Sequence, residues 1–237
     1  MREGCSLAGK LFYYALAPLL FQLVAGCSDD KAASDRTQVK RSPARSDHSA
    51  EHSRLVVVFG DSLYAGYGLK QGEGFAPELQ RALSRKGLDA YVHNAGVSGD
   101  TSAAGLQRLA FTLDGLPRKP DLVIVGLGGN DMLRGLSPEQ TRANLDAILN
   151  ELDKRHIHAM LTGMLAAPNL GKDYADAFNA IYPDLAKKHS VPLYPFFLKD
   201  VTGQRDLLLE DGIHPNAQGV DIIVRHVAPV VASSLAA

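Results

Sequence analysis

Four short segments of the sequence carry residue types that could do chemistry together. Acyl transfer needs a hydroxyl nucleophile, a histidine base, a carboxylate that orients the base, and N–H donors for the oxyanion. The segments that could supply them are Gly60-Asp61-Ser62-Leu63, Gly96-Val97-Ser98-Gly99-Asp100, Gly126-Leu127-Gly128-Gly129-Asn130-Asp131 and Asp211-Gly212-Ile213-His214-Pro215. Each segment alone is weak, but the set contains every part.

The roles follow from the residue types. Ser62 is the candidate nucleophile, while Asp211 and His214, three apart in one turn, can present carboxylate and imidazole side by side. Gly99 has no side chain, so its backbone N–H can approach a substrate closely, and Asn130 offers an amide donor. The ordinary alternative is that Ser62 only caps the next helix.

The elements that must position these residues alternate along the chain. Apolar or half-alternating runs predict strands over residues 55–59, 88–94, 122–125, 157–161 and 191–194. Helical stripes lie between them and after the last. Alternation of this kind predicts an α/β fold with a parallel sheet covered by helices on both faces. The carboxyl ends of parallel strands share one edge, so the first three segments should converge there. The fourth joins them only if the connection before the last helix folds over that edge.

Local signals refine this fold. Ser137 and Pro138 are typical of a helix start, and Gly115 of a helix end. Pro183 should kink a helical stripe that runs from Tyr174 to Leu185, or end it early. Pro192 places the last strand at a sheet edge. Residues 54–237 are expected to form one domain.

The first residues do not belong to that domain. Basic residues, an apolar run from Leu11 to Val24 and small residues after it predict a signal peptide over residues 1–26. Val24-Ala25-Gly26-Cys27 resembles the lipobox of bacterial lipoproteins, in which Cys27 would be lipidated; an ordinary secreted protein is the alternative. Residues 27–53 are expected to be a flexible tether, with His48 and His52 solvated. The mature chain would then hold no cysteine pair, so no disulfide is expected.

Composition and motifs exclude other classes. The net charge of −1 gives no reason to expect nucleic acid or an anionic membrane surface as partner. The sequence has no P-loop and no dinucleotide fingerprint. His156 and His158, read as alternating along a strand, would point to opposite faces and chelate a metal poorly.

Taken together, the four segments resemble the conserved blocks of the SGNH (GDSL) hydrolases. The match is closest to the thioesterase I, arylesterase and lysophospholipase branch, which is also similar at residues 178–183 and 191–197, and it covers roughly residues 54–233. The resemblance implies a flavodoxin-like three-layer α/β/α sandwich with a five-stranded sheet. It also implies a Ser62–His214–Asp211 triad, an oxyanion hole of Ser62, Gly99 and Asn130, and neither metal nor cofactor. Ser98 is a poorer nucleophile, because Asp100 replaces the last glycine of a G-x-S-x-G elbow.

The substrate is less clearly specified. Apolar residues in loops near the proposed site favour an acyl or aryl group over a sugar, unless they simply cover the core: Tyr64, Tyr67, Met132, Leu133, Leu165 and Pro168. We expect short to medium esters, with lysophospholipids and acyl thioesters as further substrates. The enzyme would be exported and lipid-anchored at a periplasmic or outer-membrane surface. A binding module that holds an acylated ligand without cleaving it is the alternative.

Overall fold

The computed structural model describes residues 52–236. Within this range, five strands form a single sheet in the order β2-β1-β3-β4-β5, with every neighbouring pair parallel. The strands are β1 (Arg54–Gly60), β2 (Ala90–Asn94), β3 (Leu122–Gly126), β4 (Ala159–Thr162) and β5 (Leu193–Tyr194). This confirms the parallel sheet and its flavodoxin-like order. It also places the strand that follows Pro192 at an edge, as expected.

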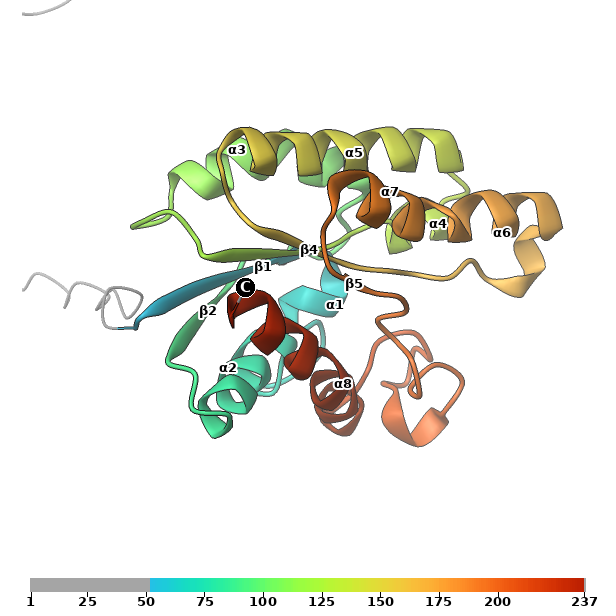
Figure 1. Ribbon diagram of the computed structural model, residues 1–237. Helices are drawn as coiled ribbons and strands as arrows, with labels where there is room; N and C mark the ends of the chain where they lie inside the picture. The colour runs from blue at the N-terminus through green and yellow to red at the C-terminus, as the bar shows by residue number, and fades with distance from the viewer. Residues whose placement is uncertain (1–51, 237) are drawn as a thin grey trace, which may run out of the picture. The chain divides into compact units, whose positions relative to one another are not determined.

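Helices cover both faces of the sheet (Figure 1). One face carries α1 (Ser62–Ala65), α2 (Phe75–Arg85) and α8 (Ala217–Ala236); the other carries α3 (Ser102–Asp114), α4 (Gly129–Leu133), α5 (Pro138–Lys154), α6 (Lys172–Asn179) and α7 (Ile181–His189). Two 3₁₀ turns, Pro168–Leu170 and Arg205–Leu207, lie in connections. Side chains of β1 alternate between the two layers: Val58 packs in the α2–α8 core and Phe59 in the α3–α5 core. The three-layer sandwich follows from this alternation.

By length and composition, α8 could cross a membrane. However, Val220, Ile223 and Val227 are buried in the core that α8 shares with α2 and the sheet. An apolar helix buried in this way is typical of the interior of a globular domain.

The helix start at Ser137 and the helix end at Gly115 are confirmed. The Ser137 side chain accepts a hydrogen bond from the Gln140 N–H with Pro138 in the first turn, and α3 is capped by Gly115. The stripe around Pro183 is two helices, α6 and α7, divided at Ala180. Proline lacks an N–H, and a new helix that begins before Pro183 places it in a first turn, where no intrahelical partner is needed.

Three strands begin later than the sequence predicts. Leu88, Ile157 and Val191 were each expected in a strand, but each donates its N–H back to the preceding helix, at Leu83, Leu152 and Ala186 respectively. The residue before each has a positive φ. This is the Schellman ending of a helix, in which an apolar residue after the turn packs back on the last helical turn. His156 therefore lies in a helix cap and not in a strand.

The boundary of the expected tether is also corrected. His52 was expected to be solvated, but its ring bonds to the Asp89 carboxylate and stacks on Tyr91, with 6.1 Å between centroids. Ser53 donates its N–H to the same carboxylate at 2.9 Å. The domain therefore includes these two residues. The expected signal peptide, Cys27, His48 and the rest of the tether lie outside the described residues.

Candidate active site

The candidate site lies where the strand order reverses. β1 pairs with β2 on one side and β3 on the other, and Gly60 at the end of β1 is in register with Gly126 at the end of β3. The segments that follow these three strands therefore meet at one edge of the sheet. In open α/β sheets this switch point is where ligands bind.

The fourth segment reaches this edge through the connection between β5 and α8, drawn in orange and red in Figure 1. The Leu209 N–H donates to the His214 carbonyl at 2.8 Å, and Leu208 and Pro215 form an antiparallel bridge. Leu209 also contacts the loop after α1, where a side chain on Gly68 would come within 2.6 Å of it. This folded connection brings His214 over the end of β1.

Ser62, His214 and Asp211 form a continuous chain of hydrogen bonds. Ser62 Oγ lies 2.8 Å from His214 Nε2, and His214 Nδ1 lies 2.7 Å from Asp211 Oδ2. If Nδ1–H donates to the carboxylate, Nε2 is left to accept the serine proton. The nucleophile, base and orienting carboxylate expected from the sequence are therefore brought together. Ser98 lines the same cavity, but His214 is directed at Ser62 instead.

Asp211 is held in its charged form by donors around it. Its Oδ1 accepts the backbone N–H groups of His214 at 3.0 Å and Ile213 at 2.9 Å, and its Oδ2 meets the imidazole. These hydrogen bonds, led by the one from the His214 backbone, lower the pKa of Asp211 to about 2. The carboxylate is ionised at any pH where the histidine can act as a base.

Asp61 is a second carboxylate at the site, in the opposite environment. It is only 3% exposed, and its Oδ1 caps α1 by accepting the Leu63 N–H at 3.1 Å. Burial raises the pKa of Asp61 to about 6, against the lowering effects of that hydrogen bond and of nearby His214. Sequence reasoning treated Asp61 only as part of a turn.

The oxyanion donor expected at Gly99 sits in a tight turn. The Asp100 N–H donates to the Val97 carbonyl at 3.2 Å, and Gly99 has a φ of 86°. A positive φ at the third residue alone is the signature of a type II turn. A side chain at Gly99 would meet only Arg134, at 3.7 Å. The glycine is therefore required by the backbone conformation of this turn, more than by the close approach expected from the sequence.

Asn130, in the first turn of α4, faces the same turn. Its Nδ2 donates to the Asp100 carbonyl at 2.9 Å, which leaves its second N–H for a ligand. Buried Asp131 anchors α4 by accepting the Ser102 N–H at 2.7 Å and the Thr141 hydroxyl at 3.2 Å. The Asp100 carbonyl therefore holds the side-chain amide, and Asp131 holds the helix that carries it.

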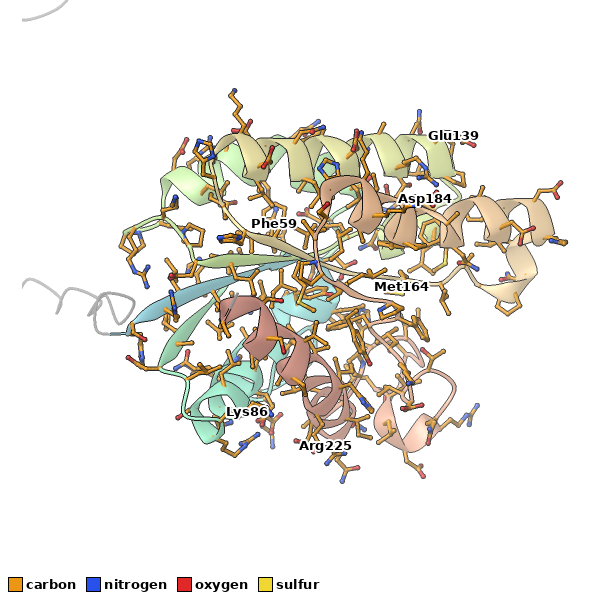
Figure 2. The ribbon with its side chains drawn as sticks, viewed as in Figure 1. Phe59, Lys86, Glu139, Met164, Asp184 and Arg225 are labelled. Atoms are coloured by element: carbon orange, nitrogen blue, oxygen red, sulfur yellow. The ribbon has the colours of Figure 1, made fainter. Side chains whose placement is uncertain are left out.

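An apolar cavity of about 290 Å³ opens beside Ser62, and it borders a second cavity of about 410 Å³. Tyr67, Met132 and Leu133, as expected, line the first cavity, and Leu165 and Pro168 line the second. Sequence reasoning missed three residues that line both: Met164, Leu198 and Ile213. Met164 lies on the segment after β4 (Figure 2). Its place just beyond a strand end was the signal that could have found it.

Tyr64 was expected to contact substrate, and the structure corrects this. It is 2% exposed, its ring stacks on Phe197 with centroids 4.6 Å apart, and its hydroxyl bonds to Thr162. The ring also fills the space beside two glycines: a side chain on Gly60 or Gly126 would come within 2.2 Å or 2.0 Å of it. Tyr64 is a core residue that fixes α1 beneath the sheet. Tyr67, three residues later, faces the site instead, 4.6 Å from the His214 ring between centroids.

Two histidines outside the candidate site, His189 and His226, are paired with aspartates. His189 bonds to Asp146 at 2.6 Å, and His226 lies 3.2 Å from Asp200. Among residues 52–236, no group of three or more His, Cys, Asp or Glu side chains is arranged to hold a metal ion.

Comparison with known proteins is consistent with this geometry. The Esterase TesA of Pseudomonas aeruginosa is 37% identical over 179 residues, covering 76% of this chain and 88% of the relative. The thioesterase 1/protease 1/lysophospholipase L1 of Escherichia coli is 38% identical over 180 residues, covering 74% and 84%. The crystal structure of AlinE4, an SGNH-hydrolase family esterase, is 52% identical with a TM-score of 0.66, covering 78% of this chain and 98% of that one. Residues 58–222 match the model of one family. The chain belongs to the GDSL-like lipase/acylhydrolase family.

Proposed function

We propose that this carboxylic ester hydrolase uses Ser62 as its nucleophile. The observation that carries the proposal is the hydrogen-bonded chain Ser62–His214–Asp211 at the mouth of an apolar cavity. His214 Nε2 takes the hydroxyl proton as Ser62 Oγ attacks the ester carbonyl. Asp211 holds the imidazole in the required tautomer and stabilises the imidazolium that forms.

The negative charge that develops on the carbonyl oxygen needs donors. We assign these to the backbone N–H groups of Ser62 and Gly99 and to the free N–H of the Asn130 amide. The tetrahedral intermediate collapses when His214 gives its proton to the departing alcohol. Water then gives a proton to the same imidazole as it attacks the acyl-enzyme. His214 passes that proton to Ser62 Oγ when the bond between the acyl group and Oγ breaks, which releases the acid and restores the free enzyme.

The substrate we propose is an ester with an apolar acyl or aryl group. The two adjoining cavities supply an apolar path that begins at Ser62 and passes Met132 and Met164. Leu133, Leu165 and Ile213 remain exposed at its rim, where an apolar chain would cover them. Lysophospholipids and acyl thioesters are further candidates, because relatives carry the names lysophospholipase, thioesterase and arylesterase.

Labelling with an alkyl phosphonate tests the nucleophile. The wild-type chain should take up one phosphonyl group, located on Ser62 by peptide mass spectrometry, with loss of all esterase activity. Ser62→Ala should not be labelled and should lose activity by roughly a million-fold. The matched control is Ser98→Ala, because Ser98 lines the same cavity. This variant should keep both the phosphonate labelling and the esterase activity. Labelling that survives Ser62→Ala, or that is lost in Ser98→Ala, refutes the assignment.

Hydrolysis of p-nitrophenyl esters of increasing chain length tests the substrate class. Activity should rise from acetate to medium chains and should depend on Ser62. A chain that binds these esters without turning them over would instead be the non-catalytic module that the sequence left as an alternative.

We also propose that the chain is exported and anchored through a lipid on Cys27. The support is the lipobox-like segment Val24-Ala25-Gly26-Cys27 after an apolar run. Fractionation should find the wild type in membranes and Cys27→Ser in the soluble fraction. If the wild type and Cys27→Ser are distributed equally between the two fractions, the proposed lipid anchor on Cys27 is wrong.

A further inference from the structure

Arg108, on α3, lies behind the candidate oxyanion hole and touches none of its donors directly. Its Nε donates to the Asp100 carboxylate at 2.5 Å, and its Nη2 donates to the Gly60 carbonyl at 3.1 Å. The guanidinium carbon lies 4.1 Å from the centre of the Phe59 ring. Phe59 is labelled in Figure 2 on the α3 side of the sheet. One planar cation thus joins the end of β1 to the turn after β2.

Each group that Arg108 holds lies within two residues of a proposed donor. Gly60 lies two residues before Ser62, whose backbone N–H is the first donor. Asp100 follows Gly99, and the Asp100 N–H closes the turn that contains Gly99. The Asp100 carbonyl accepts the hydrogen bond that orients the Asn130 amide. All three donors are therefore fixed relative to one guanidinium.

The environment makes this contact strong and rigid. The side chains of Arg108 and Asp100 are 20% and 11% exposed, and the hydrogen bond between them is charge-assisted. The Gly60 carbonyl also accepts the Val97 N–H at 3.0 Å, so the start of the turn is attached at the same atom. The planar fork of guanidinium fixes the directions of its bonds to the carboxylate and the carbonyl, whereas the three donors of an ammonium group rotate on a flexible stem.

We propose that Arg108 is a positioning residue that sets the spacing of the oxyanion hole through Asp100 and Gly60. This inference rests on the oxyanion hole described under the proposed function. Loss of the guanidinium should let the turn after β2 move relative to β1. The donors would remain present, but no longer at the separation that the transition state requires.

The test compares an ester with its thiono analogue, in which sulfur replaces the carbonyl oxygen. Sulfur accepts hydrogen bonds poorly, so a working oxyanion hole favours the oxygen ester. The ratio of kcat/KM for 4-nitrophenyl butyrate to that for O-4-nitrophenyl thionobutyrate reports this preference. The ratio does not depend on the fraction of folded enzyme, so a purely structural defect leaves it unchanged.

Arg108→Met should lower the ratio by about tenfold, as expected for a small misplacement of catalytic donors. Arg108→Lys should give an intermediate value, with most of the loss in kcat and little change in KM. If the Met variant does not fold, the Lys variant decides alone. The matched control is Arg155→Met, which removes an arginine paired with Asp114 and Glu151 on α3 and α5. It should leave the ratio unchanged.

Asn130→Ala separates failure of the inference from failure of its basis. This change removes a donor outright, so the ratio should fall and turnover should drop by about a hundred- to a thousandfold. If Asn130→Ala lowers the ratio and neither Arg108 variant does, Arg108 has no positioning role. If Asn130→Ala leaves the ratio unchanged, the oxyanion hole itself is wrongly assigned.

Discussion

Asp61 and Asp211 are two carboxylates on opposite sides of the Ser62–His214 pair, and their surroundings push them in opposite directions. Asp61 is buried behind the serine, and burial raises its pKa to about 6. Asp211 lies at the surface, and three hydrogen bonds lower its pKa to about 2. The more buried acid is thus the one that favours the neutral form.

This difference in burial suggests that the two sides of the site contribute differently to stability and to turnover. The helix that carries the serine is built into the core, where Tyr64 and Asp61 fix α1, so changes to these two supporting residues should appear mainly as lost stability. The histidine side is carried by residues 202–214 of the connection, none of which is buried, so changes there should appear mainly as lost turnover.

Among the residues that support the Ser62–His214 pair, the largest effect is expected on the exposed side. Asp211→Asn should lower kcat by about 10⁴-fold, because the amide cannot hold the imidazole in the tautomer that accepts the serine proton. Circular dichroism should show an unchanged melting temperature within a few degrees at pH 7. Asp206→Asn, an exposed aspartate of the same connection, is the control and should retain activity. A melting temperature that falls with the activity would contradict the division.

On the buried side, Tyr64→Ala should destabilise the fold by about 3–5 kcal/mol, because it removes a fully buried aromatic ring. Urea unfolding measures this loss. Tyr64→Phe, which loses only the hydrogen bond to Thr162, should cost about 1 kcal/mol. Turnover per folded molecule should change little in either variant. A large loss of turnover with unchanged stability would show that Tyr64 belongs to the site after all.

The two carboxylates also predict opposite slopes of stability against pH. The folded pKa of Asp61 lies above its unfolded value of 3.8. The free energy of unfolding should therefore fall by about 3 kcal/mol as the pH rises from about 4 to about 6. Asp211 has a folded pKa below 3.8, so its contribution is present above pH 4 and is lost as pH falls towards 2. Exposure to solvent makes this second effect smaller.

Unfolding free energies between pH 2 and 8 would reveal both slopes. Asp61→Asn keeps an oxygen to cap α1 and should remove the fall between pH 4 and 6, without affecting the loss at lower pH. Asp211→Asn should do the reverse. A wild-type curve that is flat from pH 4 to 6 would show that Asp61 is not desolvated.

The smallest effect is expected at the rim. Leu133 is 59% exposed beside the cavity, so Leu133→Ser should change stability by no more than about 0.5 kcal/mol. The KM for octanoate esters should rise a few-fold, since the lost contact is apolar, while the KM for acetate should stay the same. An equal rise for both esters would place Leu133 outside the acyl path.

The parts of this molecule that could be predicted are those governed by local chemistry. Continuous apolar runs predict buried parallel strands, and the segments after those strands could be assigned to one edge. Helix endings were harder, because Leu88 or Ile157 reads equally well as the start of a strand or as the apolar residue of a Schellman turn. Tyr64 was misplaced for a related reason: one residue of offset on a single helical turn decides between core and cavity.

Arg108 could not have been found from the sequence. Nothing in its neighbours along the chain shows that its partners are 8 and 48 residues away. Asp61 was identified as part of a motif, but its protonation depends on how deeply the turn is buried, and burial is a property of the assembled layers.

The packing of Tyr64 against Gly126 restricts the order in which this site can change over evolution. Gly60 is also held by the backbone, because a side chain there would come within 2.6 Å of the Gly126 carbonyl oxygen. At Gly126, alanine collides with the tyrosine ring while the ring is present, so this glycine is kept by a residue that takes no part in the chemistry. A change at Gly126 should therefore be tolerated after Tyr64 has been replaced by a small residue and rejected before it.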